Sequence, residues 1–236
     1  HANKYEYSKH KPAKPLYNLK DVDKTLSRFE EVQLDQWLPF FEGIKVRYQY
    51  NGHILGATFI EMAAAGKRLV FSGDIGQEED DLLFSPKRPE RADLLFIEST
   101  YGDRLHLKGD IEQELLQYIE ETYQEGGTLI IPSFAVERTQ TLMYLLWKLR
   151  EKGLMPKMPV YMDSPMGAKV LDVFHRSAAW HKLSKEDCNK MCDYIQTVSS
   201  FGETWAIIDD KSPKIVIAGS GMVTGGRVLT YLTKYL

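Results

Sequence analysis

One histidine and one aspartate occupy similar glycine-flanked turns in the first hundred residues. His53 lies in YNGHILGA (50–57) and Asp74 lies in FSGDIG (71–76), each just after a run that is typical of a β-strand. Glycine shapes tight turns, and imidazole and carboxylate groups bind metals or transfer protons. Ordinary aspartate turn chemistry is the alternative explanation for Asp74. These two donors do not complete a zinc site, because zinc takes at least three protein ligands.

Glu98 is a third candidate, at the end of the apolar run LLFIEST. A carboxylate in such a place is costly unless it has a partner. A metal ion, a protonated histidine or backbone amides would each serve as that partner.

Four apolar runs end alike, in LLFIEST, LIIPSF, VYMDSP and IVIAGS, and each enters a small polar turn that contains a serine. In an open parallel sheet, ligands bind at the carboxyl ends of the strands, where helix N-termini suit phosphate. The candidate phosphate-binding residues are Ser99, Ser133, Ser164 and Ser220, with Arg138 one turn into its helix as a guanidinium donor. The alternative is that these serines only cap helices.

The elements that would position these residues change character along the chain. A helix over 21–29 capped by Asp21 is expected first, followed by strands over 44–50, 58–64 and 67–73 with an antiparallel arrangement. From about residue 92, apolar strands alternate with amphipathic helices, beginning with the helix that Asp110 caps. This alternation predicts an α/β fold with a parallel sheet flanked by helices.

Composition places the chain among ordinary globular proteins. It has 236 residues, 43% of them hydrophobic, with a net charge of -3, so a nucleic acid would need a local patch. The lysine-rich segment 1–20 is either such a patch or a connecting segment. Cys188 and Cys192 are interpreted as reduced thiols, because a zinc site would need two more donors. Reduced thiols in turn predict a cytoplasmic location. No apolar run is long enough to span a membrane.

The sequence resembles the β-CASP branch of the metallo-β-lactamase superfamily. GHILGA, FSGDIG and IESTYGDRLH match that branch in order, and IPSFAVERTQTLMYLL, VYMDSPM and IAGSGMVTGGRVL continue the match. The similarity is greatest to RNA-processing nucleases related to the pre-mRNA 3′-end cleavage subunit, including bacterial and archaeal members. The resemblance implies part of a metallo-β-lactamase αββα sandwich over 1–97, followed by an inserted β-CASP domain over 98–236.

The resemblance also implies roles for individual residues. The family site holds two zinc ions, so His53 would ligate one zinc and Asp74 would bridge both. The pair of ions would activate water for phosphodiester hydrolysis. Glu98 would orient a histidine that helps to protonate the leaving oxygen. The partner would be RNA, gripped between the two domains; the sequence leaves open whether the protein forms a homodimer.

The family motif H-x-H-x-D-H and two later histidine motifs are absent from the 236 residues. We therefore expect an internal fragment that holds zinc weakly and does not hydrolyse RNA alone. For the full-length protein we predict a zinc-dependent ribonuclease, acting as an endonuclease, an exonuclease or both. A non-catalytic relative that binds RNA or a partner, and a hydrolase of another phosphoester including DNA, are the alternatives.

Overall fold

The structure is a computed structural model that describes residue 3 and residues 9–105 and 109–236. It divides into two units, 1–34 and 35–236. The first unit contains helix α1 (Leu19–Leu26), and its cap differs from the expected one. Asn18 caps the helix by accepting from the Lys20 amide at 2.9 Å, and Asp21 instead accepts from the Asn18 amide at 2.9 Å. Asp21 is therefore the second half of a capping box.

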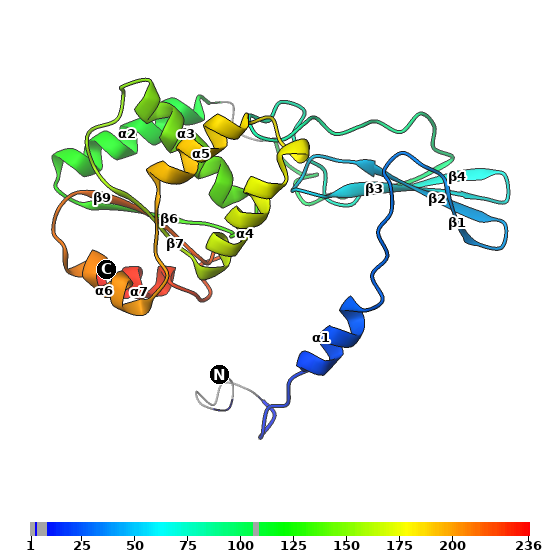
Figure 1. Ribbon diagram of the computed structural model, residues 1–236, viewed down its shortest axis with the longest axis horizontal. Helices are drawn as coiled ribbons and strands as arrows, with labels where there is room; N and C mark the ends of the chain where they lie inside the picture. Colours follow the sequence, from blue (N-terminus) through cyan, green and yellow to red (C-terminus); the bar gives the residue numbers. More distant parts are fainter. Residues whose placement is uncertain (1–2, 4–8, 106–108) are drawn as a thin grey trace. The chain divides into compact units, whose positions relative to one another are not determined.

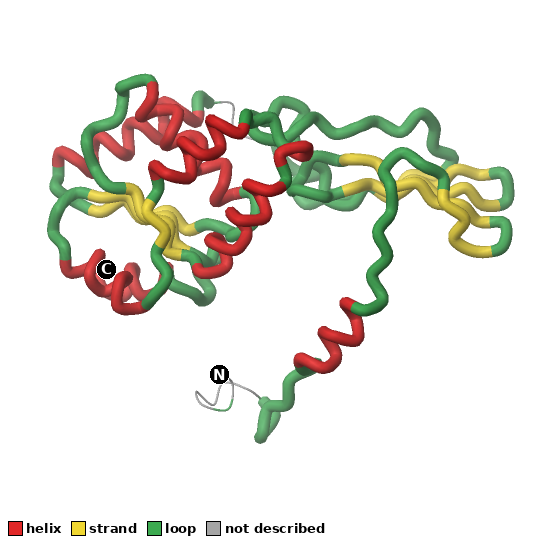
Figure 2. Tube along the Cα trace, viewed as in Figure 1, coloured by secondary structure: helices red, strands yellow, loops and turns green. Residues whose placement is uncertain are grey.

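A five-stranded sheet occupies the first part of the second unit. It contains β1 (Leu38–Phe41), β2 (Ile44–Tyr50), β3 (Thr58–Ala64), β4 (Lys67–Phe71) and β5 (Leu94–Phe96), in that spatial order. Strands β1 to β4 pair antiparallel, as the alternation of apolar and polar residues predicts, whereas β5 pairs parallel to β4. Figure 2 shows these strands side by side.

A four-stranded parallel sheet occupies the rest of the chain. It contains β6 (Thr128–Pro132), β7 (Val160–Asp163), β8 (Gln196–Thr197) and β9 (Lys214–Ala218), in the order β6-β9-β7-β8. All its pairings are parallel, so the carboxyl ends of its strands share one edge. The predicted parallel sheet is confirmed.

Helices cover both faces of the parallel sheet. They are α2 (Ile111–Gln124), α3 (Arg138–Glu151), α4 (Pro165–Arg176), η1 (Ala178–Trp180), α5 (Lys185–Tyr194), α6 (Phe201–Asp209) and α7 (Val228–Tyr235). Figure 1 shows α2, α3 and α5 over one face and α6 and α7 over the other. As expected, Asp110 caps α2, by accepting from the amides of residues 112 and 113.

Strand β9 joins two separate cores because its side chains alternate between the faces of the sheet. Ile215 and Ile217 belong to the core beneath α3, α4 and α5, whereas Val216 and Ala218 belong to the core beneath α6 and α7. All five β9 residues are buried, which explains why a doubly covered parallel strand reads as an unbroken apolar run. The α/β fold class is thereby confirmed.

Among the described residues, none of the helices has the length and apolar character needed to cross a membrane.

Candidate metal site and phosphate-binding edge

His53 and Asp74 come together in the loops at one end of the five-stranded sheet. The His53 Nε2 atom lies 3.9 Å from Asp74 Oδ2, although 21 residues separate them in the chain. Their side chains are 45% and 72% exposed, so both can reach an incoming ligand. The two turns that the sequence pairs only by their similarity are therefore neighbours in space.

Asn51 is the residue that holds these two turns together. Its side-chain amide donates to the carbonyl oxygens of Ser72 at 2.9 Å and Asp74 at 2.7 Å. Its Oδ1 atom lies 3.5 Å from the His53 amide, and its own carbonyl accepts from the Gly76 amide at 2.9 Å. Asn51 is 2% exposed, so these contacts are shielded from water. Reasoning from the sequence missed Asn51, because an Asn-Gly pair after a strand reads as a turn.

Glycines bring the two loops into direct backbone contact. A β-carbon on Gly76 would lie 2.1 Å from the carbonyl carbon and oxygen of Gly52 and 2.7 Å from the His53 nitrogen. No other residue fits there unless the backbone moves. Gly52 itself has a φ of +71°, a conformation that glycine adopts without strain. These glycines therefore set the distance between the loops of His53 and Asp74.

Glu98 has the partners that its position demands. Its Oε1 atom accepts from the Ile75 amide at 2.5 Å, and its Oε2 atom accepts from the Thr100 hydroxyl at 2.9 Å. The Glu98 amide donates to the Ser72 hydroxyl at 3.0 Å. A backbone amide, one of the three kinds of partner named from the sequence, is therefore in contact with Glu98. Glu98 thus fixes the loop that carries Asp74.

His53 and Asp74 fit as two ligands of a metal ion, but they do not make a complete set. Across residues 9–105 and 109–236, no group of three or more His, Cys, Asp and Glu side chains is arranged to hold a metal. His106, the last residue of the third family motif, lies outside the described residues. The chemistry of the pair, one imidazole and one carboxylate, suits zinc.

The phosphate-binding edge predicted from four strand ends contains only three of them. Ser133, Ser164 and Ser220 follow β6, β7 and β9 at the carboxyl edge of the parallel sheet. Ser99 does not belong there, because the run before it is β5, which pairs with β4 in the other sheet. The prediction that all four turns share one edge is wrong. The cause is that an apolar run does not reveal which sheet it joins.

Two of the three serines at this edge, Ser133 and Ser164, have hydroxyl groups engaged with the protein. Ser164 caps α4 by accepting from the Gly167 amide at 3.0 Å, and Ser133 accepts from the Thr139 hydroxyl at 3.1 Å. Both are buried. The capping explanation holds for Ser164, whereas Ser133 caps no helix, because the N-cap of α3 is Glu137 and has no side-chain cap. Arg138, at the start of α3, is exposed. Their role toward phosphate stays a prediction.

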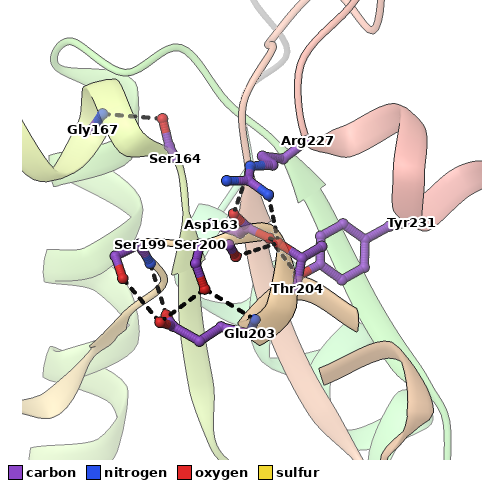
Figure 3. A network of polar contacts seen from close by, with 9 residues as sticks. All are labelled: Asp163, Ser164, Gly167, Ser199, Ser200, Glu203, Thr204, Arg227 and Tyr231. Atoms are coloured by element: carbon purple, nitrogen blue, oxygen red, sulfur yellow. Dashed lines mark hydrogen bonds and ion pairs between the residues drawn. The ribbon is translucent and has the colours of Figure 1, made fainter. Parts of the chain in front are cut away.

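A buried polar network stands at the end of β7 (Figure 3). Asp163, the last residue of β7, is fully buried, and its Oδ2 atom accepts from the hydroxyls of Thr204 at 2.6 Å and Tyr231 at 2.8 Å. Arg227 approaches its Oδ1 atom at 3.5 Å. The sequence signal was available: like Glu98, Asp163 is a carboxylate at the end of an apolar strand, which requires partners.

Glu137 adds an ionisable group with an unusual backbone. Its φ is +63°, and the Arg138 amide donates to the Val136 carbonyl at 2.8 Å, which closes a three-residue turn. Burial, and then the nearby Asp80 carboxylate, raise the pKa of Glu137 to about 7. Its Oε1 atom has no hydrogen-bond partner within the described part of the chain.

Comparison with known proteins agrees with the family motifs. Residues 139–236 match the Beta-Casp domain family. Over 226 residues, the chain is 33% identical to a ribonuclease of Thermus thermophilus, and the match covers 92% of this chain and 52% of that protein. It is 29% identical to an RNase J-like protein of Methanocaldococcus jannaschii, with coverage of 92% and 52%. It is also 29% identical to the endoribonuclease ysh1 of Schizosaccharomyces pombe, with coverage of 93% and 30%.

The chain spans about half the length of the first two relatives and less of the third. The matches nevertheless include both sheets of this chain, since they cover more than nine-tenths of its residues. The motifs, the mixed and parallel sheets, and these matches agree: residues 139–236 belong to the Beta-Casp domain family, and the chain as a whole is similar to nucleases of the β-CASP branch of the metallo-β-lactamase superfamily.

Proposed function

We propose that the protein carrying this chain is a metal-dependent phosphodiester hydrolase that acts on RNA. The observation that carries the proposal is the convergence of His53 and Asp74 to 3.9 Å in two loops locked together by Asn51. A pair of exposed donors held by a buried amide is an organised half of a metal site. The ribonuclease names of the relatives support RNA as the substrate class.

In this proposal His53 and Asp74 would hold zinc, with Asp74 shared between two ions. Zinc would polarise the phosphate and lower the pKa of a water molecule. The chain itself supplies position: Asn51 and Glu98 fix the loop of Asp74, so the ligands need little rearrangement when the metal enters. The additional role of Glu98 in orienting a histidine belongs to the proposal.

The carboxyl edge of the parallel sheet would hold the RNA backbone. Ser133, Ser164 and Ser220 line it, and the exposed Arg138 at the start of α3 supplies a positive charge. Guanidinium groups bind phosphate oxygens in a bidentate manner. Ser99 would act apart from this edge, in the loop that follows Glu98.

The test measures bound zinc and RNA cleavage by the intact protein and by its Asp74→Asn variant. Substitution of a direct ligand is expected to lower activity by more than the roughly 10- to 100-fold seen for outer-shell changes. Asp209→Asn, which removes an exposed carboxylate at the end of α6, is the matched control and should keep full activity.

Full activity and zinc content in Asp74→Asn would refute the bridging role. RNA binding by the unaltered protein without zinc or cleavage would instead favour a non-catalytic RNA-binding relative. Cleavage of DNA in preference to RNA would change the assigned substrate from RNA to DNA.

We also propose a cytoplasmic location, which the free thiols of Cys188 and Cys192 support. Thiol titration of the freshly isolated native protein would test it, with both thiols expected to be reduced.

A further inference from the structure

Two exposed phenylalanines stand at the carboxyl edge of the parallel sheet. Phe134 follows β6 and is 52% exposed, and Phe201 opens α6 after β8 and is 59% exposed. Because β6 and β8 are the outer strands of the sheet, three strand spacings, or about 14 Å, separate them. Each aromatic ring therefore lies near one side of the edge where Ser133, Ser164 and Ser220 lie.

One face of the Phe201 ring carries a cation. The guanidinium carbon of Arg227 lies 3.5 Å from the ring centroid, a close cation–π contact. Arg227 is only 8% exposed, so the exposure of Phe201 belongs to its other face and its rim. A ring with a cation beneath it and an open face above it is suited to stack a nucleobase.

Arg227 is fixed in this position by the network of Figure 3. Its Nε atom lies 3.5 Å from Asp163 Oδ1, and its Nη1 atom donates to the Thr204 hydroxyl at 2.9 Å. Tyr231 donates to the other oxygen of Asp163 at 2.8 Å and so orients that carboxylate. Within the described residues, the Nη2 atom of Arg227 makes no hydrogen bond, which leaves it able to meet a phosphate oxygen.

The ring of Phe134 is fixed as well. A β-carbon on Gly221 would lie 2.8 Å from the Phe134 ring, so the ring packs directly on the backbone of the loop after β9. Its remaining surface faces solvent. Both aromatic rings are thus held in place before any ligand arrives, which reduces the entropy cost of binding.

Glu203, two residues after Phe201, carries a negative charge that is already hydrogen-bonded. The Glu203 carboxylate accepts from the Ser199 amide at 2.8 Å and from the hydroxyls of Ser199 and Ser200 at 2.9 and 3.1 Å. Those hydrogen bonds lower the pKa of Glu203 and turn its charge toward the turn before α6. The carboxylate does not contact Arg227 in the network shown in Figure 3.

We propose that this edge is a stacking surface for single-stranded RNA, with Phe201 and Phe134 each stacking one base and Arg227 contacting a phosphate beside Phe201. The choice of RNA rests on the proposed function, whereas stacking itself requires only unpaired bases. The outer strands lie about 14 Å apart, a span that a few nucleotides of a single strand can cover. A short single strand can therefore engage both aromatic rings.

The first test measures binding of a single-stranded RNA octamer to the intact protein in an Asp74→Asn background, which slows cleavage. Phe201→Leu keeps an apolar side chain but removes the aromatic ring, and it should weaken binding about tenfold. Phe201→Tyr should restore binding. Tyr118→Leu, at a half-exposed tyrosine on α2, is the matched control and should change nothing.

Abasic positions in the octamer distinguish stacking from a general surface effect. If a base stacks on Phe201, one abasic position should weaken binding to the unaltered protein and have little further effect on Phe201→Leu. Equal losses in both proteins would overturn the assignment of that base to Phe201.

The salt dependence of binding tests Arg227. Arg227→Gln should reduce the slope of log K against log salt by about 0.7, the value for one lost phosphate contact on a single strand. Its thermal unfolding must be measured too, because the residue is buried. Weaker binding with an unchanged slope would mean that Arg227 only supports the ring.

Equal binding of double-stranded RNA, or no effect of Phe201→Leu and Phe134→Leu, would overturn the proposal. If a protein partner rather than RNA loses affinity in the Phe201→Leu variant, the surface is a protein interface. These binding measurements do not require activity, so their failure is distinguishable from loss of zinc-dependent cleavage.

Discussion

Strands β9 and β5 are both apolar and both pair parallel to a neighbour, yet their surroundings are opposite. All five residues of β9 are buried, whereas Leu94, Leu95 and Phe96 of β5 are each more than half exposed. The difference comes from the helices that cover both faces of the parallel sheet. The loops of His53 and Asp74, which we propose to bind metal, therefore belong to the less densely packed sheet, which fits the tendency of ligand sites to lie in regions of lower local stability.

Each sheet also has one fully buried carboxylate, and the two are satisfied differently. Glu61 on β3 meets Arg47 at 2.6 Å and Arg68 at 3.3 Å; Arg68 is 24% exposed, whereas Arg47 is nearly as buried as Arg227. Asp163 meets one arginine and two hydroxyl groups inside the domain. Glu61 therefore shares its charge with two arginines, of which Arg47 also has Glu90 at 4.0 Å, whereas the carboxylate that Arg227 contacts is Asp163.

The largest effect is expected for Asp163→Ala. This variant leaves Arg227 buried and uncompensated, so the free energy of unfolding should fall by about 3–5 kcal/mol. Glu61→Ala should cost less, about 1–3 kcal/mol, because Arg47 keeps the Glu90 carboxylate nearby and the partly exposed Arg68 can turn to water. Urea unfolding of both variants measures the two losses in the free energy of unfolding. Equal losses would mean that the two pairs are equally shielded.

A second prediction tests the packing of the two strands directly. Ile217→Ala on β9 creates a cavity in a closed core and should lower the free energy of unfolding by about 3 kcal/mol. Leu95→Ala on β5 removes a half-exposed side chain and should cost less than about 1 kcal/mol. Denaturant midpoints with unchanged slopes would measure the difference. A large loss in Leu95→Ala would show that β5 is covered in solution.

The smallest of these effects on stability concerns Glu137, which lies just before α3. The Asp80 carboxylate, in the loop before β5, is close to it. The pKa of Glu137 is raised to about 7 in the folded protein, so the folded state holds its proton more tightly than the unfolded state. Stability should therefore fall as pH rises from about 4.5 through 7. Glu137→Gln should unfold like the unaltered protein at pH 4 but be about 2 kcal/mol more stable at pH 8, allowing for partial solvent contact.

Thermal unfolding at several pH values checks this prediction. Asp209→Asn, which alters an exposed carboxylate, is the control and should leave the pH profile unchanged. A constant difference between Glu137→Gln and the unaltered protein across pH would indicate altered packing rather than titration.

Periodic segments were predictable from the sequence, whereas contacts between distant segments were not. The alternation of apolar strands and amphipathic helices predicted the parallel sheet, and Asp110 marked the start of α2. Ser99 was placed at the wrong sheet, because LLFIEST has the same pattern as a doubly covered strand. The family motifs identified His53 and Asp74, but the role of Asn51 depends on hydrogen bonds across more than twenty residues.

The amide of Asn51 has a consequence for the order in which a metal ion is captured. Because it ties the Asp74 loop to the turn of His53, the two ligands that we propose are in place before an ion arrives. Capture there would then be limited by the exchange of water on the ion and not by loop closure. Asn51→Ser shortens this side chain and removes its amide. Metal binding by that variant would then be limited by movement of the two loops and not by the encounter with the ion.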